Sequence, residues 1–382
     1  MAAHVERKEL PGLVTLVAQG EDVHVDAIGG KSFDSAEPMR RETLFRIASM
    51  TKPILAVATL MLIEDGKLAL EDRIDRWLPE MGNPRVLRRI DGPLDETVPA
   101  RRPLTVDDLL TFRMGNGILT EPSYEPPYPI VTAARDLQLV LSHPDPRTPH
   151  APDEWMKRFG SLPLMDQPGE RWRYNVGSLL LGVLVARVSG QALGDFFATR
   201  IFEPLGMQTT GFHLPLAATR DLPAYYMTDF KTGRLERRAE STAEEWSRPP
   251  AFPSGAGGLV STADDYLAFG RFLLNGGEYR GRRLLSAKSV EVMTTNHLTA
   301  EQMGTAGAIL GGQGWGLGLA VVTEPDDAWP IPGRYGWAGG YGTTWFNDPH
   351  LGVTALLLSQ TSDVMWNGTL AEFDALVGGC FV

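Results

Sequence analysis

The sequence predicts an α+β fold, because strand-like segments lie at both ends of the chain and helical segments with long loops lie between them. Residues 12–18 and 23–28 are rich in β-branched and apolar side chains and flank a Gly-Glu-Asp turn, which predicts an N-terminal hairpin. Residues 343–347 and 352–359 flank an Asp-Pro turn in the same way near the C-terminus. We therefore expect strands from both chain ends and a mainly helical middle.

Capping signals mark helix starts in the rest of the chain. Thr105 is expected to cap a short helix over residues 106–112. Ser261 and Asp264 form a capping-box pattern for a helix that runs to Leu274. The sequence shows no internal repeat, so a repeat array is not expected.

Composition and charge argue against several classes of partner. The 382 residues include 36 basic and 47 acidic side chains, a net charge of -11, without a basic run, so we expect no nucleic-acid partner. The first ten residues are charged where a secretory signal needs an apolar core of roughly 7 to 15 residues. The longest apolar runs, 54–63 and 179–186, are too short to cross a bilayer. We expect a cytoplasmic protein with no membrane partner.

A Ser-x-x-Lys tetrad, Ser49-Met50-Thr51-Lys52, follows the strand-like run 43–47 and opens an apolar helical run. Residues three apart on a helix share a face, so the Lys52 amine can reach the Ser49 hydroxyl. A serine hydroxyl is a weak nucleophile unless a neighbouring base or a desolvated lysine activates it. The first turn of a helix also favours the negative charge that develops on a carbonyl oxygen during acyl transfer. The pattern indicates a nucleophile beside its activator, and the same tetrad also occurs as an ordinary helix cap.

Tyr174 lies in the segment Arg-Trp-Arg-Tyr-Asn-Val-Gly, residues 171–177, on a loop before the helical run that begins at Leu179. A tyrosine near two cationic groups has a lowered pKa and can act as a general base. The other interpretation is a buried aromatic side chain whose hydroxyl caps the next helix.

Residues 335–342, Tyr-Gly-Trp-Ala-Gly-Gly-Tyr-Gly, place several glycines in a strand-like pattern just before the C-terminal hairpin. Glycine within a strand often marks the close approach of another backbone or of a ligand. A glycine-rich hairpin without a ligand is the alternative.

Taken in order, these three segments resemble the active-site motifs of the serine β-lactamase and penicillin-binding-protein superfamily. They are most similar to its class C-like branch, which contains the family VIII carboxylesterases. The Ser-x-x-Lys motif of that branch matches Ser49 and Lys52, and its tyrosine motif matches Tyr174. Its Trp/His/Lys-x-Gly motif matches Trp337 and Gly339. Connecting segments are similar as well, so the resemblance spans nearly the whole chain.

The resemblance implies a β-lactamase/transpeptidase-like fold, an α/β sandwich in which the two chain ends join in one antiparallel sheet flanked by helices. Residues 1–72 and 250–382 would form this α/β region. Residues 73–249 would form a mainly helical region with long loops, and the active site would lie in the cleft between the two regions.

The resemblance also implies a two-step acyl transfer. Ser49 Oγ attacks the carbonyl while Tyr174 and Lys52 together take its proton, and the same pair later activates water. We assign the base to the pair because strongly interacting groups titrate as a unit. The backbone N–H groups of Ser49 and Gly340 would bind the oxyanion. No cofactor or metal is expected.

Two departures from the lactamase motifs favour small to medium neutral esters as substrates. Val176 stands where lactamases carry the asparagine of Tyr-x-Asn, and Trp337 stands where their third motif begins with lysine. A substrate site lined by Trp337 and Gly339 would lack those amide and charge-assisted hydrogen bonds and would gain an apolar wall. We therefore expect a carboxylesterase acting on a small-molecule ester.

Two other function classes stay open. The same fold supports amide chemistry, as in β-lactam hydrolysis or D-aminopeptidase activity, and it supports acyltransferase activity. A non-catalytic member would use the cleft only to bind a ligand, although the presence of all three catalytic side chains argues against it. The chain has no Gly-x-Ser-x-Gly elbow, which argues against an α/β-hydrolase triad.

Residues 121–153 are rich in proline and aromatic residues, among them Tyr124 and Tyr128. They form either a lid over the acyl or alcohol pocket or an ordered surface excursion. His143 and His150 lie in this stretch without the spacing of metal ligands, so we expect them to be solvated.

Overall fold

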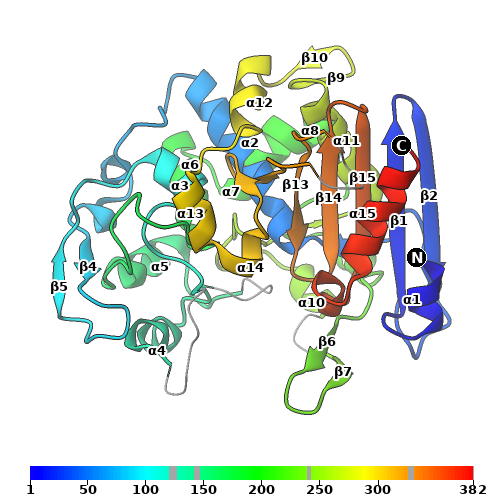
Figure 1. Ribbon diagram of the computed structural model, residues 1–382, viewed down its shortest axis with the longest axis horizontal. Coiled ribbons are helices and arrows are strands. Elements are labelled where there is room, and N and C mark those ends of the chain that lie inside the picture. Colours follow the sequence, from blue (N-terminus) through cyan, green and yellow to red (C-terminus); the bar gives the residue numbers. More distant parts are fainter. Residues whose placement is uncertain (120–126, 142–146, 239–241, 326–330, 382) are drawn as a thin grey trace.

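The computed structural model describes residues 1–381 apart from 120–126, 142–146, 239–241 and 326–330. Its centre is a seven-stranded antiparallel sheet (Figure 1). In spatial order the strands are β11 (Gly314–Trp315), β12 (Ala320–Val321), β13 (Tyr335–Gly339), β14 (Thr343–Asp348), β15 (Val353–Ser359), β1 (Gly12–Gln19) and β2 (Asp22–Gly29).

The pairing of β1 with β15 joins the two ends of the chain in the middle of the sheet. Leu13 lies opposite Ser359 and Gln19 lies opposite Val353. All of β15 and most of β1 are buried, which is why both strands read as nearly continuous apolar runs. The β1–β2 and β14–β15 hairpins predicted from the sequence are confirmed.

Helices cover both faces of the sheet. On one face, α11 (Ala263–Leu274) packs against β1, β14 and β15 in the same apolar cluster as α2 (Thr51–Glu64). On the other face, α15 (Thr369–Gly379) covers the alternate side chains of β15 (Figure 1). Leu356 and Leu358 point to the first face and Leu357 points to the second, as strand geometry requires. The expected antiparallel sheet flanked by helices is therefore confirmed.

Short helices and two-stranded ribbons make up most of the remaining described structure. The other helices are α1 (Ala2–Glu6), α3 (Val106–Leu110), α4 (Pro129–Asp136), α5 (Pro152–Phe159), α6 (Val176–Ser189), α7 (Leu193–Phe197), α8 (Glu203–Leu205), α9 (Leu216–Thr219), α10 (Ala243–Trp246), α12 (Ala287–Met293), α13 (Ala300–Thr305) and α14 (Gly307–Leu310). The ribbons are β3 (Phe45–Arg46) with β8 (Val260–Ser261), β4 (Arg85–Leu87) with β5 (Thr97–Pro99), β6 (Tyr226–Asp229) with β7 (Arg234–Arg237), and β9 (Glu278–Tyr279) with β10 (Arg282–Arg283). Shorter turns of helix are η1 (Ala48–Met50), η2 (Ile74–Arg76), η3 (Pro79–Met81), η4 (Ala198–Phe202) and η5 (Ser362–Met365).

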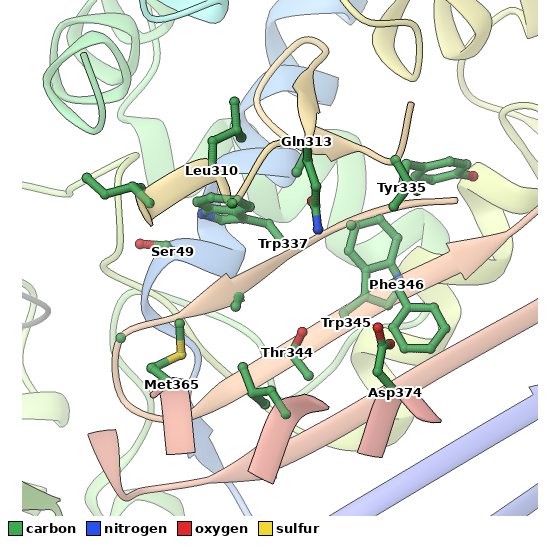
Figure 2. A pocket seen from close by; sticks show the side chains of 18 of the residues that line it. Ser49, Leu310, Gln313, Tyr335, Trp337, Thr344, Trp345, Phe346, Met365 and Asp374 are labelled. Carbon is green, nitrogen blue, oxygen red and sulfur yellow. The ribbon is translucent and has the colours of Figure 1, made fainter. Parts of the chain in front are cut away.

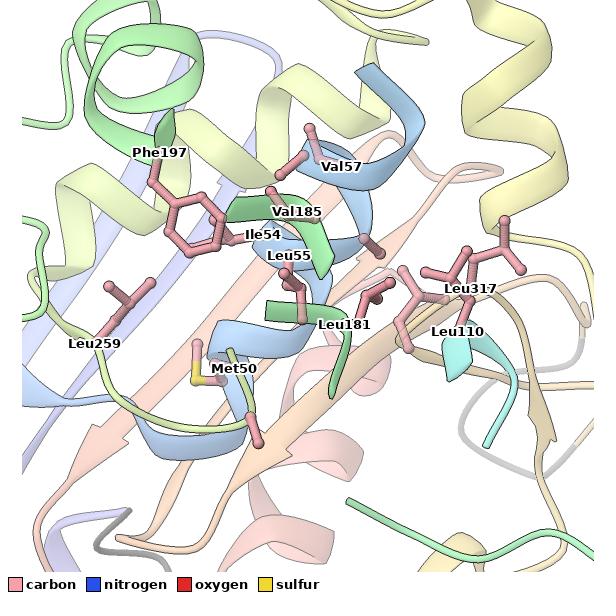
Figure 3. Packing of buried hydrophobic residues seen from close by; sticks show 14 of the residues in the cluster. Met50, Ile54, Leu55, Val57, Leu110, Leu181, Val185, Phe197, Leu259 and Leu317 are labelled. Atoms are coloured by element: carbon pink, nitrogen blue, oxygen red, sulfur yellow. The ribbon is translucent and has the colours of Figure 1, made fainter. Parts of the chain in front are cut away.

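The helix that carries the Ser-x-x-Lys lysine is buried on all sides. Every residue of α2 from Thr51 to Leu62 is buried, and α6 packs against it. Figure 3 shows Leu55 of α2 in the same cluster as Leu181 and Val185 of α6. Helices that are apolar all round belong in a core. This packing fixes the start of α2, and with it the position of Ser49.

The two predicted helix starts have different outcomes. Thr105 caps α3 as expected and forms a capping box with Asp108. The start predicted for α11 is wrong by one residue, because Thr262 accepts the capping hydrogen bond from the N–H of Asp265. Ser261 is instead the last residue of β8, and its pairing with β3 keeps it in an extended conformation.

Within the described ranges, no single helix has both the length and the hydropathy of a membrane span. The segments Val176–Ser189 and Leu193–Leu205 meet that criterion only when they are taken together across a 78° bend.

Candidate active site

Ser49 lies in the short link between strand β3 and helix α2. The chain leaves β3, forms the single turn η1, and enters α2 at Thr51. Ala48 has φ = +42°, in the left-handed region that residues with a Cβ rarely adopt. Strained backbone of this kind is found mainly at functional sites. In this structure it accompanies a half-buried Ser49 between the buried residues Ala48 and Met50.

Lys52 lies beside Ser49, as the tetrad predicts. Its Nζ is 2.9 Å from Ser49 Oγ and 2.6 Å from the carbonyl oxygen of Ala256, and the residue is 1% exposed. Burial lowers the pKa of the Lys52 amine well below its ordinary value, because a desolvated site disfavours the charged form. A neutral amine next to the serine hydroxyl can accept its proton.

Tyr174 contacts both members of this pair. Lys52 Nζ lies 4.5 Å from the centroid of the Tyr174 ring. The Tyr174 hydroxyl is hydrogen bonded to Ser49, and it accepts a hydrogen bond of 2.6 Å from Nε1 of Trp337. The structure thus brings Ser49, Lys52, Tyr174 and Trp337 together.

The expectation that nearby cations lower the pKa of Tyr174 is wrong. Burial raises this pKa, and the hydrogen bonds from Ser49 and Trp337 only partly oppose the shift. The Arg173 guanidinium pairs with Asp166, and Lys52 faces the ring of Tyr174. The hydroxyl does not cap α6 either, because its partners are Ser49 and Trp337.

Aromatic rings surround Tyr174 and account for its desolvation. The ring centroids of Phe112, Trp172, Trp315 and Trp337 lie 5.5, 5.7, 6.3 and 5.4 Å from that of Tyr174. Sequence reasoning missed this cluster. Trp172 lies in the tyrosine segment itself, but Phe112 and Trp315 are far away in the sequence and carry no local signal.

A strained turn positions Tyr174 at the start of α6. Asn175 has φ = +87° and ψ = -54°, and the N–H of Val176 lies 3.3 Å from the carbonyl oxygen of Tyr174. These values describe a γ-turn with positive φ at its centre, which is a rare and strained form. The Asn175 side chain donates a 2.6 Å hydrogen bond to the carbonyl oxygen of Leu141 and helps to hold this geometry.

The end of β13 packs directly against the backbone that precedes Ser49. A Cβ atom on Gly339 would lie 2.2 Å from the carbonyl oxygen of Ile47, so no larger residue fits there. Gly339 and Thr343 form the last pair of the β13–β14 ladder. Gly340 follows, outside the ladder, and lines the same cavity as Ser49. Both backbone N–H groups expected to bind an oxyanion therefore belong to residues of one cavity.

The cavity has a volume of about 660 Å³, and its lining includes Ser49, Tyr174, Trp337 and Gly340. Figure 2 shows Ser49 and Trp337 at this site. This volume falls within the roughly 300–1,000 Å³ of small-molecule sites. Val176 is fully buried in the core, and Asn175 lines the cavity in its place. The departure at Val176 therefore does not add an apolar wall to the site.

Only part of the stretch 121–153 is described, and Tyr124 and His143 lie outside the described residues. The lid interpretation stays a prediction, and no described residue of this stretch lines the cavity. His150 is buried, with Nε2 3.0 Å from the carbonyl oxygen of Leu137, so the expectation that it is solvated is wrong. Nowhere in the described parts of the chain do three or more His, Cys, Asp or Glu side chains form a group suited to a metal ion.

Comparisons with known proteins show the family and the fold of the chain. A family model described as Beta-lactamase matches residues 1–376. Protein Rv1367c of Mycobacterium tuberculosis is 40% identical over 362 residues, which cover 92% of this chain and 86% of that protein. Esterase EstB of Burkholderia gladioli is 31% identical over 394 residues, which cover 97% of this chain and 92% of the esterase. The solved structure of EstCE1, described as a hydrolase with promiscuous acyltransferase activity, has a TM-score of 0.79 at 23% identity and covers 98% of this chain and 95% of its own. This structural likeness confirms the expected fold class.

Proposed function

The chain belongs to the beta-lactamase family, and from this we propose that it is a carboxylesterase that cleaves small to medium neutral esters through an acyl-enzyme on Ser49. The observation that carries the proposal is the 2.9 Å contact between Lys52 Nζ and Ser49 Oγ, at a site where burial lowers the pKa of the lysine. A neutral amine beside a serine hydroxyl activates the hydroxyl as a nucleophile. The similarity to an esterase over nearly the whole chain supports the reaction class.

In the acylation step, Ser49 Oγ attacks the carbonyl carbon of the ester, and the Lys52–Tyr174 pair takes the hydroxyl proton. The tetrahedral intermediate then collapses, the bond from carbon to the alcohol oxygen breaks, and the pair returns the proton to that oxygen. In deacylation, water replaces the alcohol and the same pair moves its proton, which releases the acid and regenerates Ser49. The pair ends each step in its starting protonation state.

The directions of the two pKa shifts assign different roles to Lys52 and Tyr174. A lowered pKa leaves Lys52 as a neutral amine that can hold the serine proton, whereas a raised pKa leaves Tyr174 protonated. Tyr174 is hydrogen bonded to Ser49 and can therefore pass a proton towards the leaving oxygen. On this assignment Lys52 is the base and Tyr174 is the relay.

Backbone N–H groups of Ser49 and Gly340 are proposed to stabilise the oxyanion. Both residues line the cavity, and the approach of Gly339 to Ile47 holds their two segments together. Each such donor is worth about 3 kcal/mol of barrier in related chemistry.

The polar groups near the nucleophile favour neutral esters over esters that carry a carboxylate. The indole N–H of Trp337 is already bonded to Tyr174, and the amide nitrogen of Asn175 is bonded to Leu141. A substrate carboxylate would therefore gain no charge-assisted hydrogen bond from Trp337, and charge-assisted bonds are the strong ones.

The test is labelling and turnover by the full-length protein. A fluorophosphonate ester should add one adduct to the wild type and none to Ser49→Ala, as read by intact mass. Wild type should turn over p-nitrophenyl esters with a much higher kcat/KM than a chromogenic cephalosporin. Ser49→Ala with near wild-type esterase activity would contradict the mechanism, and a higher kcat/KM for the cephalosporin would favour amide chemistry.

A further inference from the structure

The cavity beside Ser49 is lined by β13 residues from Tyr335 to Ala338, so it extends along this strand as a trough. Ser49 and Asp374 lie at opposite ends of the lining (Figure 2). Gly340 follows β13 and lines the cavity with Ser49, and Arg334 is hydrogen bonded to Asp374. Gly339 comes five residues after Arg334, which corresponds to roughly 17 Å at the usual rise of about 3.3 Å per residue of a strand. The trough is therefore much longer than an acetyl or similar short group requires.

Three of the four residues that form the floor in the middle of the trough, Gly336, Ala338 and Thr344, are small, and the fourth is Phe346. Ala338 of β13 lies opposite Thr344 of β14, and Gly336 lies opposite Phe346. Alternate residues of a strand share a face, so these four positions point to the same side of the sheet, where α15 packs. Leu370 of α15 lines the trough as well. Small residues on the floor leave room for a chain that lies along the strand.

The far end of the trough is polar. Arg334 donates hydrogen bonds of 2.5 and 2.8 Å to the two carboxylate oxygens of Asp374, and its Cζ lies 4.7 Å from the centroid of the Phe346 ring. The Arg334 side chain is 7% exposed and that of Asp374 is 34% exposed. The more accessible group at this end is thus a carboxylate, which accepts hydrogen bonds.

We propose that the trough binds an elongated half of the substrate, an apolar chain that starts at the ester on Ser49, lies over Ala338 and Thr344, and ends in a hydrogen-bond donor at Asp374. The donor is a hydroxyl or an ammonium group. This inference rests on the proposed function, because it needs an ester held at Ser49. It refines the proposed substrate class to esters with one long chain that ends in a donor, which is neutral for a hydroxyl end and cationic for an ammonium end.

The first test blocks the trough. In Thr344→Phe a ring fills the floor between Ser49 and Asp374, and Thr344→Ser is the matched control that keeps the trough open. Two substrate series are used, p-nitrophenyl esters from acetyl to dodecanoyl and acetates of alcohols of the same lengths. One series lengthens the acyl half of the ester and the other lengthens the alcohol half. Thr344→Phe should lose at least about tenfold in kcat/KM for the long members of the series whose lengthened half lies in the trough. It should keep wild-type activity on p-nitrophenyl acetate.

An unchanged ratio of long-chain to acetyl activity in both series would overturn the proposal. Leu370→Trp, which narrows the trough from the α15 side, repeats the test if Thr344→Phe does not fold. Failure of the proposed function is distinguishable, because a protein without esterase activity would not hydrolyse even the acetyl ester.

The second test examines the polar end with the chain length that performs best. Methyl, hydroxyl, ammonium and carboxylate ends are compared on the wild type and on Asp374→Asn. A hydroxyl or ammonium end should raise kcat/KM by about tenfold over the methyl end, the size of one hydrogen bond to a charged group, and Asp374→Asn should reduce that gain. Whichever of the hydroxyl and ammonium ends gives the larger kcat/KM identifies the substrate as hydroxylated or aminated. A preference for the carboxylate end would overturn the assignment of Asp374.

Discussion

The indole nitrogen of Trp337 donates a 2.6 Å hydrogen bond to the hydroxyl oxygen of Tyr174. An indole N–H can only donate, so the tyrosine oxygen must accept this bond, and its own proton is left for another partner. Ser49 is also hydrogen bonded to the Tyr174 hydroxyl, which keeps that oxygen next to the nucleophile. The tryptophan thus orients the tyrosine and stabilises any negative charge that forms on its oxygen.

Trp337→Phe should lower kcat without much change in KM for short esters. The variant keeps an aromatic ring but removes the donor, and a hydrogen bond to a developing charge is worth about 1.5–3 kcal/mol, or roughly a 10- to 100-fold loss in kcat. Steady-state kinetics with p-nitrophenyl acetate measure the effect. Trp366→Phe, at an exposed tryptophan on the wall of the same cavity, is the control. An unchanged kcat in Trp337→Phe would show that the bond does not support catalysis.

The pH dependence of kcat/KM should follow the Lys52 amine. Only the neutral amine can take the serine proton, so activity should rise with pH until Lys52 is deprotonated. Because burial lowers the pKa of Lys52, this rise should be complete well below the ordinary lysine value of about 10.4. Lys52→Ala should lose several orders of magnitude at every pH, and non-additively with Tyr174→Phe. A rise in activity centred near the ordinary lysine pKa would contradict a desolvated Lys52.

Replacing the same lysine should stabilise the fold. With its pKa lowered in the native state, Lys52 binds fewer protons there than in the unfolded chain between the lowered and the ordinary value. The free energy of unfolding therefore falls as the pH drops through this window, and it levels off below the lowered pKa. Lys52→Met has no amine that must lose a proton on folding, so it should be more stable than the wild type at neutral pH. The difference in the free energy of unfolding should shrink as the pH approaches about 10. Urea unfolding of both proteins across this range measures the difference, and a constant difference would contradict the linkage.

Gly339 should tolerate no side chain. A Cβ atom would lie 2.2 Å from the Ile47 carbonyl oxygen and 2.4 Å from Thr343 Oγ1, so β13 or the backbone before Ser49 must shift. Overpacking of this kind costs about 1–3 kcal/mol, and the shift would also separate Gly340 from Ser49. Gly339→Ala should lower both the melting temperature and kcat. Gly304→Ala is the control, because nothing lies near its Cβ position. Full activity in Gly339→Ala would show that the oxyanion site does not depend on this contact.

Local sequence pattern was sufficient for the parts of the site that depend on short spacing. Ser49 and Lys52 are three residues apart and meet as expected, and the glycine at 339 marks a close approach of two backbones. The hairpins at the chain ends follow from turn and strand patterns. The joining of those ends in one sheet came from the family resemblance, because local sequence patterns do not show which distant strands pair.

Electrostatics and long-range packing explain what the sequence did not reveal. The arginines next to Tyr174 suggested a lowered pKa, but Arg173 pairs with Asp166, and aromatic rings from distant segments desolvate the tyrosine. His150 was expected to be solvated, but it is buried and hydrogen bonded to the carbonyl oxygen of Leu137. In both cases the decisive neighbour is identified only when the fold is known.

Asn175 should be the residue that fixes the position of Tyr174 relative to Ser49. Its φ of +87° favours glycine, whereas its side-chain bond to Leu141 favours asparagine, so the two requirements can be separated by mutation. Asn175→Ala loses the hydrogen bond and keeps the backbone strain, and it should cost about 1–3 kcal/mol of stability together with a lower kcat. Asn175→Gly also loses the bond but relieves the strain, and it should recover stability without recovering kcat, because a glycine turn no longer fixes the tyrosine. Chemical denaturation and turnover of p-nitrophenyl acetate measure the two effects. If Asn175→Gly regains kcat in step with stability, the bond to Leu141 has no role in positioning Tyr174.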